Sequence, residues 1–319
     1  MSRPFAPRLR VSSYLSGWMP TGDEVPYVRS GYVAGGTDSS GKVSGIDKIA
    51  FPADTKTTLS ATLTNATTGS AGFANSGVAG YNGGGDDGSR TNRIDKITFL
   101  ADTKSTLSAT LSSSRDNLMG FANSSVAGYF LGGFDSGGGI DAIDKITFPA
   151  DSKTTLSATL TSILYHSAGL ANSGVAGYVG GGYAPYTNRI DKIAFPADTK
   201  STLSATLSSS RRLMADFANS GVAGYFAGGL DFNDTGVSGI DKITFSADTK
   251  STLAATLTTA RWSISGMADT GVAGYISGGA GYLSGIDKIT FAADTKSTLS
   301  ATLTTARDRT AAFADCGVF

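Results

Sequence analysis

The sequence is short of the residues that build helices. Its 319 residues contain no glutamine and a single glutamate, Glu24, while glycine occupies 42 positions. Glutamine and glutamate are good helix formers, whereas glycine is among the poorest. Threonine, valine, isoleucine, tyrosine and phenylalanine are plentiful instead, and these residues favour strands. The composition predicts an all-β protein, and 40% hydrophobic residues suffice for a sizeable core.

Cysteine and histidine are equally scarce. With one cysteine, Cys316, and one histidine, His166, the chain can form neither an internal disulfide nor a histidine cluster for zinc or copper. A Ser-His-Asp triad could use only His166, which we interpret as an incidental surface residue. The glycine-rich stretches also lack the Gly-Lys-Ser/Thr ending of a phosphate-binding loop. We therefore expect a protein that is not an enzyme and has no metal and no cofactor.

An excess of charge and long apolar runs are missing too. Lysine plus arginine and aspartate plus glutamate number 26 each, so no net field attracts nucleic acid. No apolar run approaches the ~20 residues of a membrane-spanning helix. Pro4, Pro7 and several serines interrupt the N-terminal stretch before a signal-like apolar block forms. We expect no nucleic acid partner, no membrane insertion and no export by the general secretory route.

What the chain has instead is one unit written six times. Each unit carries Gly-Tyr, then Ile-Asp-Lys-Ile, Ala-Asp-Thr/Ser-Lys and Thr-Leu-Ser/Ala-Ala-Thr-Leu. The Gly-Tyr tyrosines recur 47 to 50 residues apart, at Tyr32, Tyr81, Tyr129, Tyr178, Tyr225 and Tyr275. Turn signals divide each unit into four strand-length stretches, a to d, which in the fifth copy are 213–221, 222–229, 239–248 and 251–259. Stretch d alternates apolar and polar residues, with Leu253, Ala255 and Leu257 on one face.

The two ends of the chain complement each other. Residues 314–319 read as the end of stretch a and the start of b, while the first unit enters with b at residues 29–32 and has no a before it. Four-stranded repeats of ~40 to 50 residues are typical of propeller blades. We predict a six-bladed β-propeller over residues 30–319, with four strands per blade. The C-terminal strand would complete the N-terminal blade and so remove two open edges.

The pattern also carries a resemblance. The order of arginine, a small apolar strand, Gly-Tyr-x-x-Gly-Gly, a variable loop and two further strands resembles the kelch repeat, although a kelch blade usually has tryptophan where this chain has leucine and threonine. Together with I-D-K-I-x-F-x-A-D-T, it is similar to kelch-like repeat proteins of cyanobacterial and marine phages, which are commonly tail or other virion components. The resemblance implies a phage tail protein that acts outside the cell. We expect the segment 1–29, with Arg3, Arg8, Arg10 and Trp18, to attach it to other virion proteins.

The six copies differ mainly in two of their four links. The a–b and c–d links hardly change, whereas the b–c and d–a links vary, and alternating strand directions bring both variable links to one face. Aromatic residues and arginines on that face are typical of recognition surfaces. We predict that it binds a host surface glycan or protein through Arg115, Tyr165, His166, Tyr183, Tyr186, Arg211, Arg212, Asp231, Phe232, Arg261, Trp262, Tyr282, Arg307 and Arg309.

Two alternatives stay open for these residues. Loops drift in sequence when nothing constrains them. Arg115, Arg211, Arg261 and Arg307 also share one register, in which an arginine could bond loop carbonyls of the adjacent blade instead of a ligand. For the protein as a whole, a purely structural virion protein that bridges other components is the second interpretation. A glycan-degrading propeller is the third.

Two columns of aspartate recur in every unit, which favours an architectural role over the paired carboxylates of a glycosidase. In Ala-Asp-Thr-Lys, we predict an Asx-type turn in which the carboxylate accepts from nearby backbone N–H groups. In Ile-Asp-Lys-Ile, we predict pairing with a lysine or a backbone donor across blades. Calcium would be the one metal to consider, at Asp86 with Asp87 or at Asp231 with Asp234, but neither spacing matches an EF-hand loop.

Overall fold

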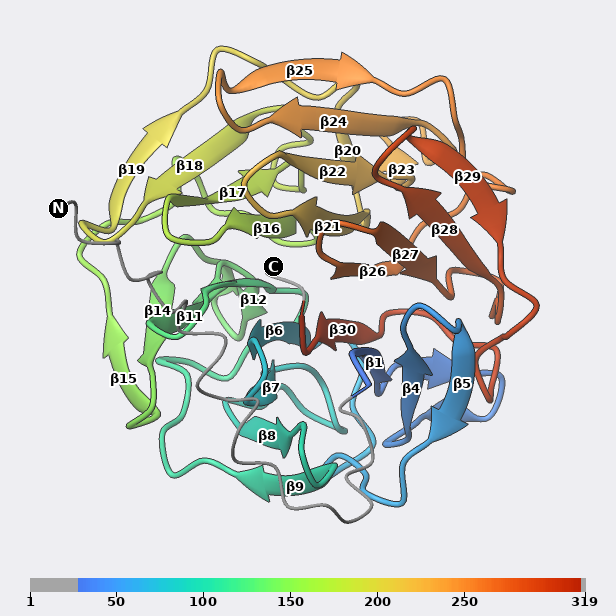
Figure 1. Ribbon diagram of the computed structural model, residues 1–319. Coiled ribbons are helices and arrows are strands. Elements are labelled where there is room, and N and C mark those ends of the chain that lie inside the picture. Colours follow the sequence, from blue (N-terminus) through green and yellow to red (C-terminus); the bar gives the residue numbers. More distant parts are fainter. Residues whose placement is uncertain (1–27, 317–319) are drawn as a thin grey trace, which may run out of the picture.

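The computed structural model describes residues 28–316. Six four-stranded antiparallel sheets stand around a central axis (Figure 1), and no helix occurs in this part of the chain. The predicted all-β, six-bladed propeller is therefore confirmed. The candidate attachment residues Arg3, Arg8, Arg10 and Trp18 lie outside the described residues.

Each blade runs from an inner strand a at the axis to an outer strand d at the rim. The a strands are β30 (Ala311–Ala314), β6 (Ala71–Asn75), β10 (Met119–Asn123), β16 (Ala168–Asn172), β21 (Ala215–Asn219) and β26 (Ser265–Asp269). The b strands are β1 (Ser30–Ala34), β7 (Ala79–Gly83), β11 (Ala127–Leu131), β17 (Ala176–Gly180), β22 (Ala223–Ala227) and β27 (Ala273–Ser277). The c strands are β4 (Ile46–Ala50), β8 (Ile94–Thr98), β14 (Ile143–Thr147), β18 (Ile190–Ala194), β24 (Ile240–Thr244) and β28 (Ile286–Thr290). The d strands are β5 (Thr55–Thr58), β9 (Thr103–Thr106), β15 (Ser152–Thr155), β19 (Thr199–Thr202), β25 (Thr249–Thr252) and β29 (Thr295–Thr298).

The ring closes in the first blade. Its inner strand is β30, from the end of the chain, and its other three strands are β1, β4 and β5. Register pairs Tyr32 with Phe313, and the Asp315 carboxylate accepts from the Ser30 backbone N–H at 2.8 Å. The predicted closure is confirmed, and it leaves neither β1 nor β30 as a free edge.

The outer strand lies earlier in the repeat than its alternation predicts. In the fifth blade β25 is Thr249–Thr252, whereas Leu253, Ala255 and Leu257 follow the strand. Only every fourth backbone N–H of that stretch bonds the blade, from Leu253 to Ile240 and from Leu257 to Ser238. The alternation of apolar and polar residues reflects which side chains are buried. Here they are buried by a segment that crosses the edge of the blade without forming a ladder of β-sheet hydrogen bonds.

The repeated string forms the seams between blades. At the first seam Tyr32 stacks on Phe99 of the next blade at 5.1 Å, and its hydroxyl donates to Asp102 at 2.9 Å. Lys48 donates to the second Asp102 oxygen at 2.8 Å and lies over the Tyr32 ring. The same three groups meet at the other five seams, the last of which joins Tyr275 and Lys288 to Asp54.

These contacts correct the expected role of the Ala-Asp-Thr-Lys aspartates. Their carboxylates do not serve the local turn but bind the tyrosine and lysine of the preceding blade, about 50 to 70 residues away in the sequence except where the ring closes. The aspartate contributes to the turn through its backbone conformation, because its φ is positive, 50° to 56°, in all six copies. Aspartate tolerates this left-handed conformation better than most residues.

The Ile-Asp-Lys-Ile aspartates are buried between blades, and cross-blade backbone donors bind them as predicted. Asp241 accepts from the backbone N–H and the hydroxyl of Ser208 in the preceding blade, at 2.8 and 2.9 Å. Thr252 of its own blade donates at 2.7 Å. Burial disfavours the charged form, but these donors and the charge of Arg211 outweigh it and hold the Asp241 pKa below its usual value.

The glycine of each Gly-Tyr pair makes room for the neighbouring blade. A Cβ at Gly128 would lie 2.0 Å from the Phe73 ring of the preceding blade. Large side chains on the a strands therefore fill the space that glycine leaves on the b strands. The glycine-rich b strands thus lie where neighbouring sheets converge.

Candidate binding face and channel mouth

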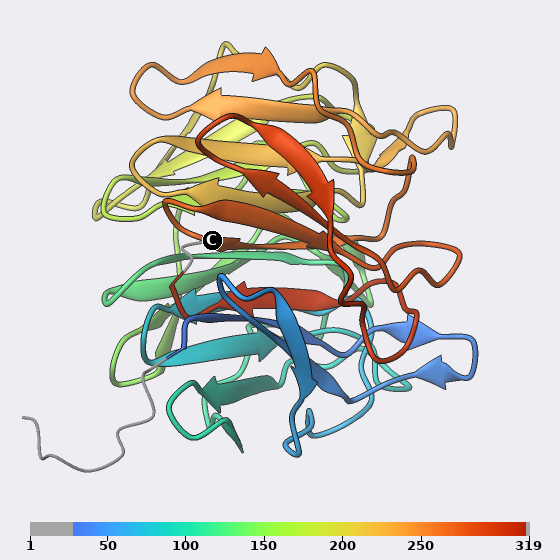
Figure 2. The ribbon, with the colours of Figure 1, turned by 45° about the vertical axis from the view of Figure 1, so that its right-hand side comes forward.

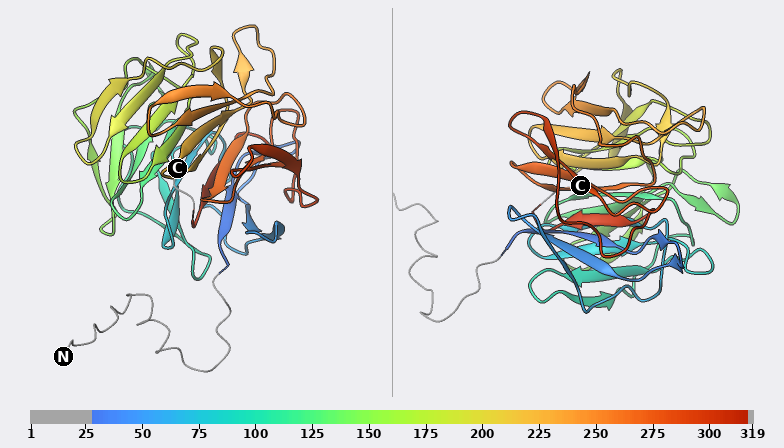
Figure 3. Two further views of the ribbon diagram at one scale, coloured as in Figure 1. Left: turned by 45° about the horizontal axis from the view of Figure 1, so that its top comes forward. Right: turned by 90° about the vertical axis from the view of Figure 1, so that its right-hand side faces the viewer.

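The variable links emerge together on one face of the disc, here termed the variable face. In each blade the b–c link pairs with the d–a link that enters the same blade. Backbone bonds or bridges join Thr37 to Asp308, Thr68 to Asp86, Asp116 to Phe134, Tyr165 to Tyr183, β20 (Arg211–Arg212) to β23 (Leu230–Asp231) and Trp262 to Ala280. Two hairpins, β2 (Thr37–Asp38) with β3 (Gly41–Lys42) and β12 (Phe134–Asp135) with β13 (Gly138–Gly139), project from this face (Figures 2 and 3).

Four of the predicted binding residues are buried beneath this face. Arg115, Arg211, Arg261 and Arg307 are 0 to 4% exposed. Arg211 donates to the carbonyls of Gly228 and Gly239 at 3.0 and 3.1 Å, and to Asp241 at 2.7 Å. The other three make the equivalent ion pairs with Asp144, Asp287 and Asp47. These arginines have the structural role left open as an alternative, and their guanidinium groups cannot reach a ligand on the surface.

Two blades lack an arginine in this register and obtain one from the other variable link. Thr67 and Leu164 replace the arginine before β6 and β16, where the preserved aspartates are Asp95 and Asp191. Arg93 approaches Asp95 to 4.0 Å, and Arg189 approaches Asp191 to 3.4 Å. The sequence alone could have shown this exchange. Arg-Ile-Asp-Lys occurs only in the two blades that are entered by a d–a link without arginine.

Aromatic residues of the third and fourth blades form a continuous row on the variable face. Phe134, Tyr165, Tyr183 and Tyr186, here termed the aromatic row, make successive edge-on contacts with centroids 5.1, 5.2 and 4.9 Å apart. Arg212 lies over both Tyr183 and Tyr186, and Arg90 caps the Phe134 end. Asp234 accepts from Tyr186 and from Arg212, at 3.0 Å each. The row rests on polar and cation–π contacts that hold half-buried rings in place.

The remaining predicted residues lie apart from the row. Phe232 is 67% exposed at the tip of the fifth b–c link, whose turn is held by Asp231, which accepts from the backbone of Asn233 and Thr235. Trp262 packs beside Gly236, and Tyr282 is exposed in the sixth blade. The structure thus brings Tyr165, His166, Tyr183, Tyr186 and Arg212 together. Phe134, Arg90 and Asp234 complete the group, and sequence reasoning did not select them because their partners lie in neighbouring links.

A closed backbone ring surrounds the mouth of the central channel on the variable face. Each blade contributes the second residue before its a strand, and each of these donates its N–H to the carbonyl of the ring residue before it, at 2.7 to 3.1 Å. All six have a positive φ of 50° to 65°. The members, in order, are Gly69, Asn117, His166, Leu213, Ser263 and Arg309. Six residues of six different types, five of them with a side chain, therefore surround one opening.

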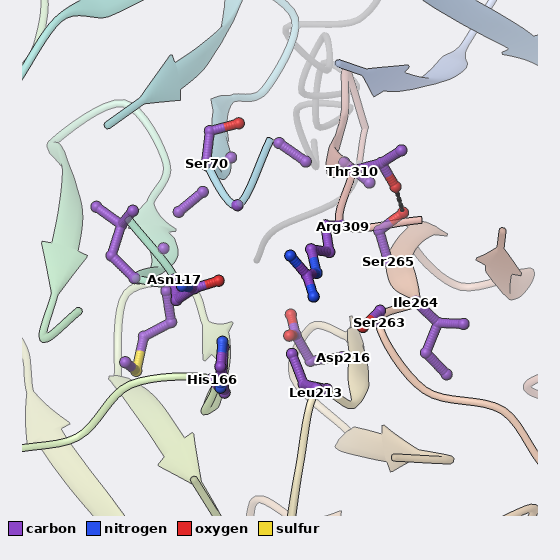
Figure 4. Close-up of a pocket in the computed structure, with 18 of the residues that line it drawn as sticks. Ser70, Asn117, His166, Leu213, Asp216, Ser263, Ile264, Ser265, Arg309 and Thr310 are labelled. Atoms are coloured by element: carbon purple, nitrogen blue, oxygen red, sulfur yellow. Dashed lines mark hydrogen bonds between the residues drawn. The ribbon is translucent and has the colours of Figure 1, made fainter. Parts of the chain in front are cut away.

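The channel mouth encloses a cavity of about 110 Å³ (Figure 4). Arg309 and Asp216 both point into it, and His166 and Asn117 form another part of its wall. Burial raises the pKa of Asp216 to about 8, against one hydrogen bond from the Gly169 N–H. Burial, with the nearby charges of Arg212 and Arg309, lowers the pKa of His166 to about 3. At neutral pH the histidine is uncharged and Asp216 is largely protonated.

The acidic loops do not gather into a metal site. Asp86 pairs with Lys42 at 2.6 Å, and Asp87 pairs with Arg93 at 3.0 Å. Within residues 28–316, no group of three or more histidine, cysteine, aspartate or glutamate side chains is arranged to hold a metal ion. What the variable face offers chemically is a surface of rings, guanidinium groups and hydrogen-bonding side chains around a small polar cavity.

Fold and face together define a six-bladed β-propeller with one structurally uniform and one variable face. No known protein family matches the chain, and no curated protein matches it significantly. In the described part of the chain, no helix is long and apolar enough to cross a membrane.

Proposed function

We propose that this propeller is a non-enzymatic phage virion protein, tail-associated, that binds a host surface receptor through its variable face. The aromatic row carries the proposal. Rigid aromatic rings and arginines supply large contact area at little entropic cost, which is why they dominate recognition sites. Here four rings and two arginines from several blades form one patch, although each link alone contributes only one or two of them.

The virion setting comes from the resemblance of the repeats to kelch-like proteins of cyanobacterial phages. In this proposal residues 1–29 bind other virion proteins, and the protein acts outside the cell. Mass spectrometry or immunolabelling of purified phage particles tests the setting. Absence of the protein from particles would contradict it, whatever the variable face binds.

Adsorption to host cells tests the role of the row. We expect Tyr183→Ala with Tyr186→Ala to reduce adsorption at least about tenfold, since each large aromatic anchor contributes on the order of 1–2 kcal/mol or more. Leu100→Ala is the control, because it removes an 89% exposed large side chain from a c–d link, away from the variable face. Unchanged adsorption of the double variant, with an unchanged melting temperature, would favour the purely structural virion protein instead.

A further inference from the structure

The channel cavity contains one residue that the architecture does not need. The position of Asp216 on its inner strand is occupied by Gly72, Gly120, Gly169, Gly266 and Ala312 in the other five blades. Among the described residues no cation lies within ion-pair distance of its carboxylate. A carboxylate that is partly shielded from water and has no cationic partner costs stability. In a ring of nearly identical units, such a departure indicates a functional site.

The backbone ring supports this interpretation independently. Its left-handed conformation suits Gly69 and Asn117, but it disfavours His166, Leu213 and Arg309. The Nδ1 atom of His166 is shielded from solvent and has no hydrogen-bond partner. Arg309 is exposed at the mouth and, within residues 28–316, forms no ion pair. Asp216 and Arg309, which line one cavity, therefore keep charged groups without an ion-pair partner among the described residues, and His166 beside them keeps one buried nitrogen unsatisfied.

We infer that the channel mouth binds the terminal sugar of an acidic glycan, with the sugar carboxylate on Arg309 and its hydroxyls on Asp216, His166 and Asn117. This inference rests on the proposed function and narrows its receptor to one chemical class. The cavity of about 110 Å³ is small, so we expect it to take a single terminal unit and not an internal stretch of the glycan. His166 contacts Tyr165 at 5.1 Å, so the units that follow the terminal sugar lie on the aromatic row.

The charges of the cavity favour an acid over a neutral sugar. Among the described residues that line the cavity, Arg309 is the one that carries a formal charge at neutral pH, because Asp216 is largely protonated and His166 is neutral. The protonated Asp216 both donates and accepts, as a sugar hydroxyl requires. Arg212, the other nearby cation, is held by Asp234 and by the row.

Each substitution that tests this site introduces a residue that occurs at the equivalent position of another blade. Asp216→Gly installs the residue of four other blades, while His166→Asn and Arg309→Asn install the residue of the third blade. Each therefore fits its backbone. Lys42→Ala is the charge-matched control for Arg309, because Lys42 belongs to the variable face but is bound to Asp86. Melting temperatures no lower than that of the wild type confirm that all four variants fold.

Calorimetric titration of the full-length protein measures the affinity. The probes are the methyl glycosides of glucuronic, galacturonic and N-acetylneuraminic acid, with methyl glucoside and methyl galactoside as neutral partners. We expect at least one acidic probe to bind more tightly than the neutral ones. Arg309→Asn should weaken it about tenfold or more, as loss of a charge-assisted hydrogen bond does, while Lys42→Ala leaves it unchanged. Binding of none of the acidic probes, or equal binding by Arg309→Asn, overturns the inference.

The pH dependence is a second readout. Affinity for the acidic probe should fall as the pH rises through about 8, because Asp216 then ionises beside the bound carboxylate. Asp216→Gly should remove this dependence. Host adsorption separates the two proposals. If Tyr183→Ala with Tyr186→Ala reduces adsorption but Asp216→Gly and Arg309→Asn do not, the receptor-binding function stands and the channel site is wrong. If none of these changes reduces adsorption, both are wrong.

Discussion

In every blade, one of the two variable links supplies an arginine that pairs with the buried Ile-Asp-Lys-Ile aspartate. Moving this arginine from one link to the other tests how much the ion pair stabilises the blade. In the fifth blade Arg211 precedes β21, and Gly239 stands two residues before the buried Asp241. In the fourth blade the same two positions are Leu164 and Arg189. Arg211→Leu therefore removes the arginine, and Gly239→Arg returns it from the opposite link.

The cost of Arg211→Leu follows from its contacts. The guanidinium is fully buried and bonds the carbonyls of Phe226, Gly228 and Gly239 as well as Asp241. Breaking a buried pair from one side costs about 3–5 kcal/mol. Asp241 keeps its donors from Ser208 and Thr252, which places the loss near the lower limit, about 3 kcal/mol. In a domain of about 290 residues that corresponds to about 5 °C in melting temperature.

Adding Gly239→Arg to Arg211→Leu should restore at least half of the lost unfolding free energy. A Cβ at Gly239 meets nothing closer than Val237 at 3.8 Å, and its φ is not in the left-handed region, so an arginine fits. In the fourth blade the equivalent Arg189 binds Asp191 and Ser162. The recovery is incomplete because the new arginine serves the carboxylate but not the carbonyls of Phe226 and Gly228.

Urea or thermal unfolding of the wild type, the two single variants and the double variant forms a complete double-mutant cycle. The loss in Arg211→Leu should also shrink as the pH falls below about 4. The Asp241 pKa is lowered in the folded protein, so its contribution is present above the unfolded pKa and disappears on protonation. A loss under about 1 kcal/mol, or a double variant no more stable than Arg211→Leu alone, would refute the assigned role of this arginine.

Three further outcomes are expected. Deleting residues 311–319 should leave β1 with an open edge and without the Tyr32–Phe313 contact, so size-exclusion chromatography should show aggregation instead of the wild-type peak. Tyr275→Phe, which removes the hydroxyl donated to Asp54 at the last seam, should cost about 1 kcal/mol in urea unfolding, and a cost near zero would argue against the seam bond. Asp216→Asn should raise the melting temperature at pH 8 but not at pH 4. The pKa of Asp216 is raised from 3.8 to about 8 in the folded protein, so this residue destabilises the native state increasingly as the pH rises between those values. An equal gain at both pH values would contradict the raised pKa.

Much of the fold was decided by patterns that the sequence displays directly. The spacing of the Gly-Tyr pairs sets six blades, and the complementary ends of the chain set the closure in the first blade. The face of the disc that varies follows from which of the four links vary in sequence. These properties depend on order along the chain and on the alternating direction of neighbouring strands, so they need no knowledge of distant contacts.

The tertiary structure decided which side chains serve the architecture and which face a ligand. Asp102 looks like a turn residue in sequence, yet its carboxylate binds Tyr32 and Lys48 of another blade. Arg211 and Arg212 are adjacent, but one is buried against Asp241 and the other lies over the aromatic row. Asp216 gains its significance only when six inner strands meet around one channel. Partners tens of residues apart leave no local period, so only closing the ring reveals them.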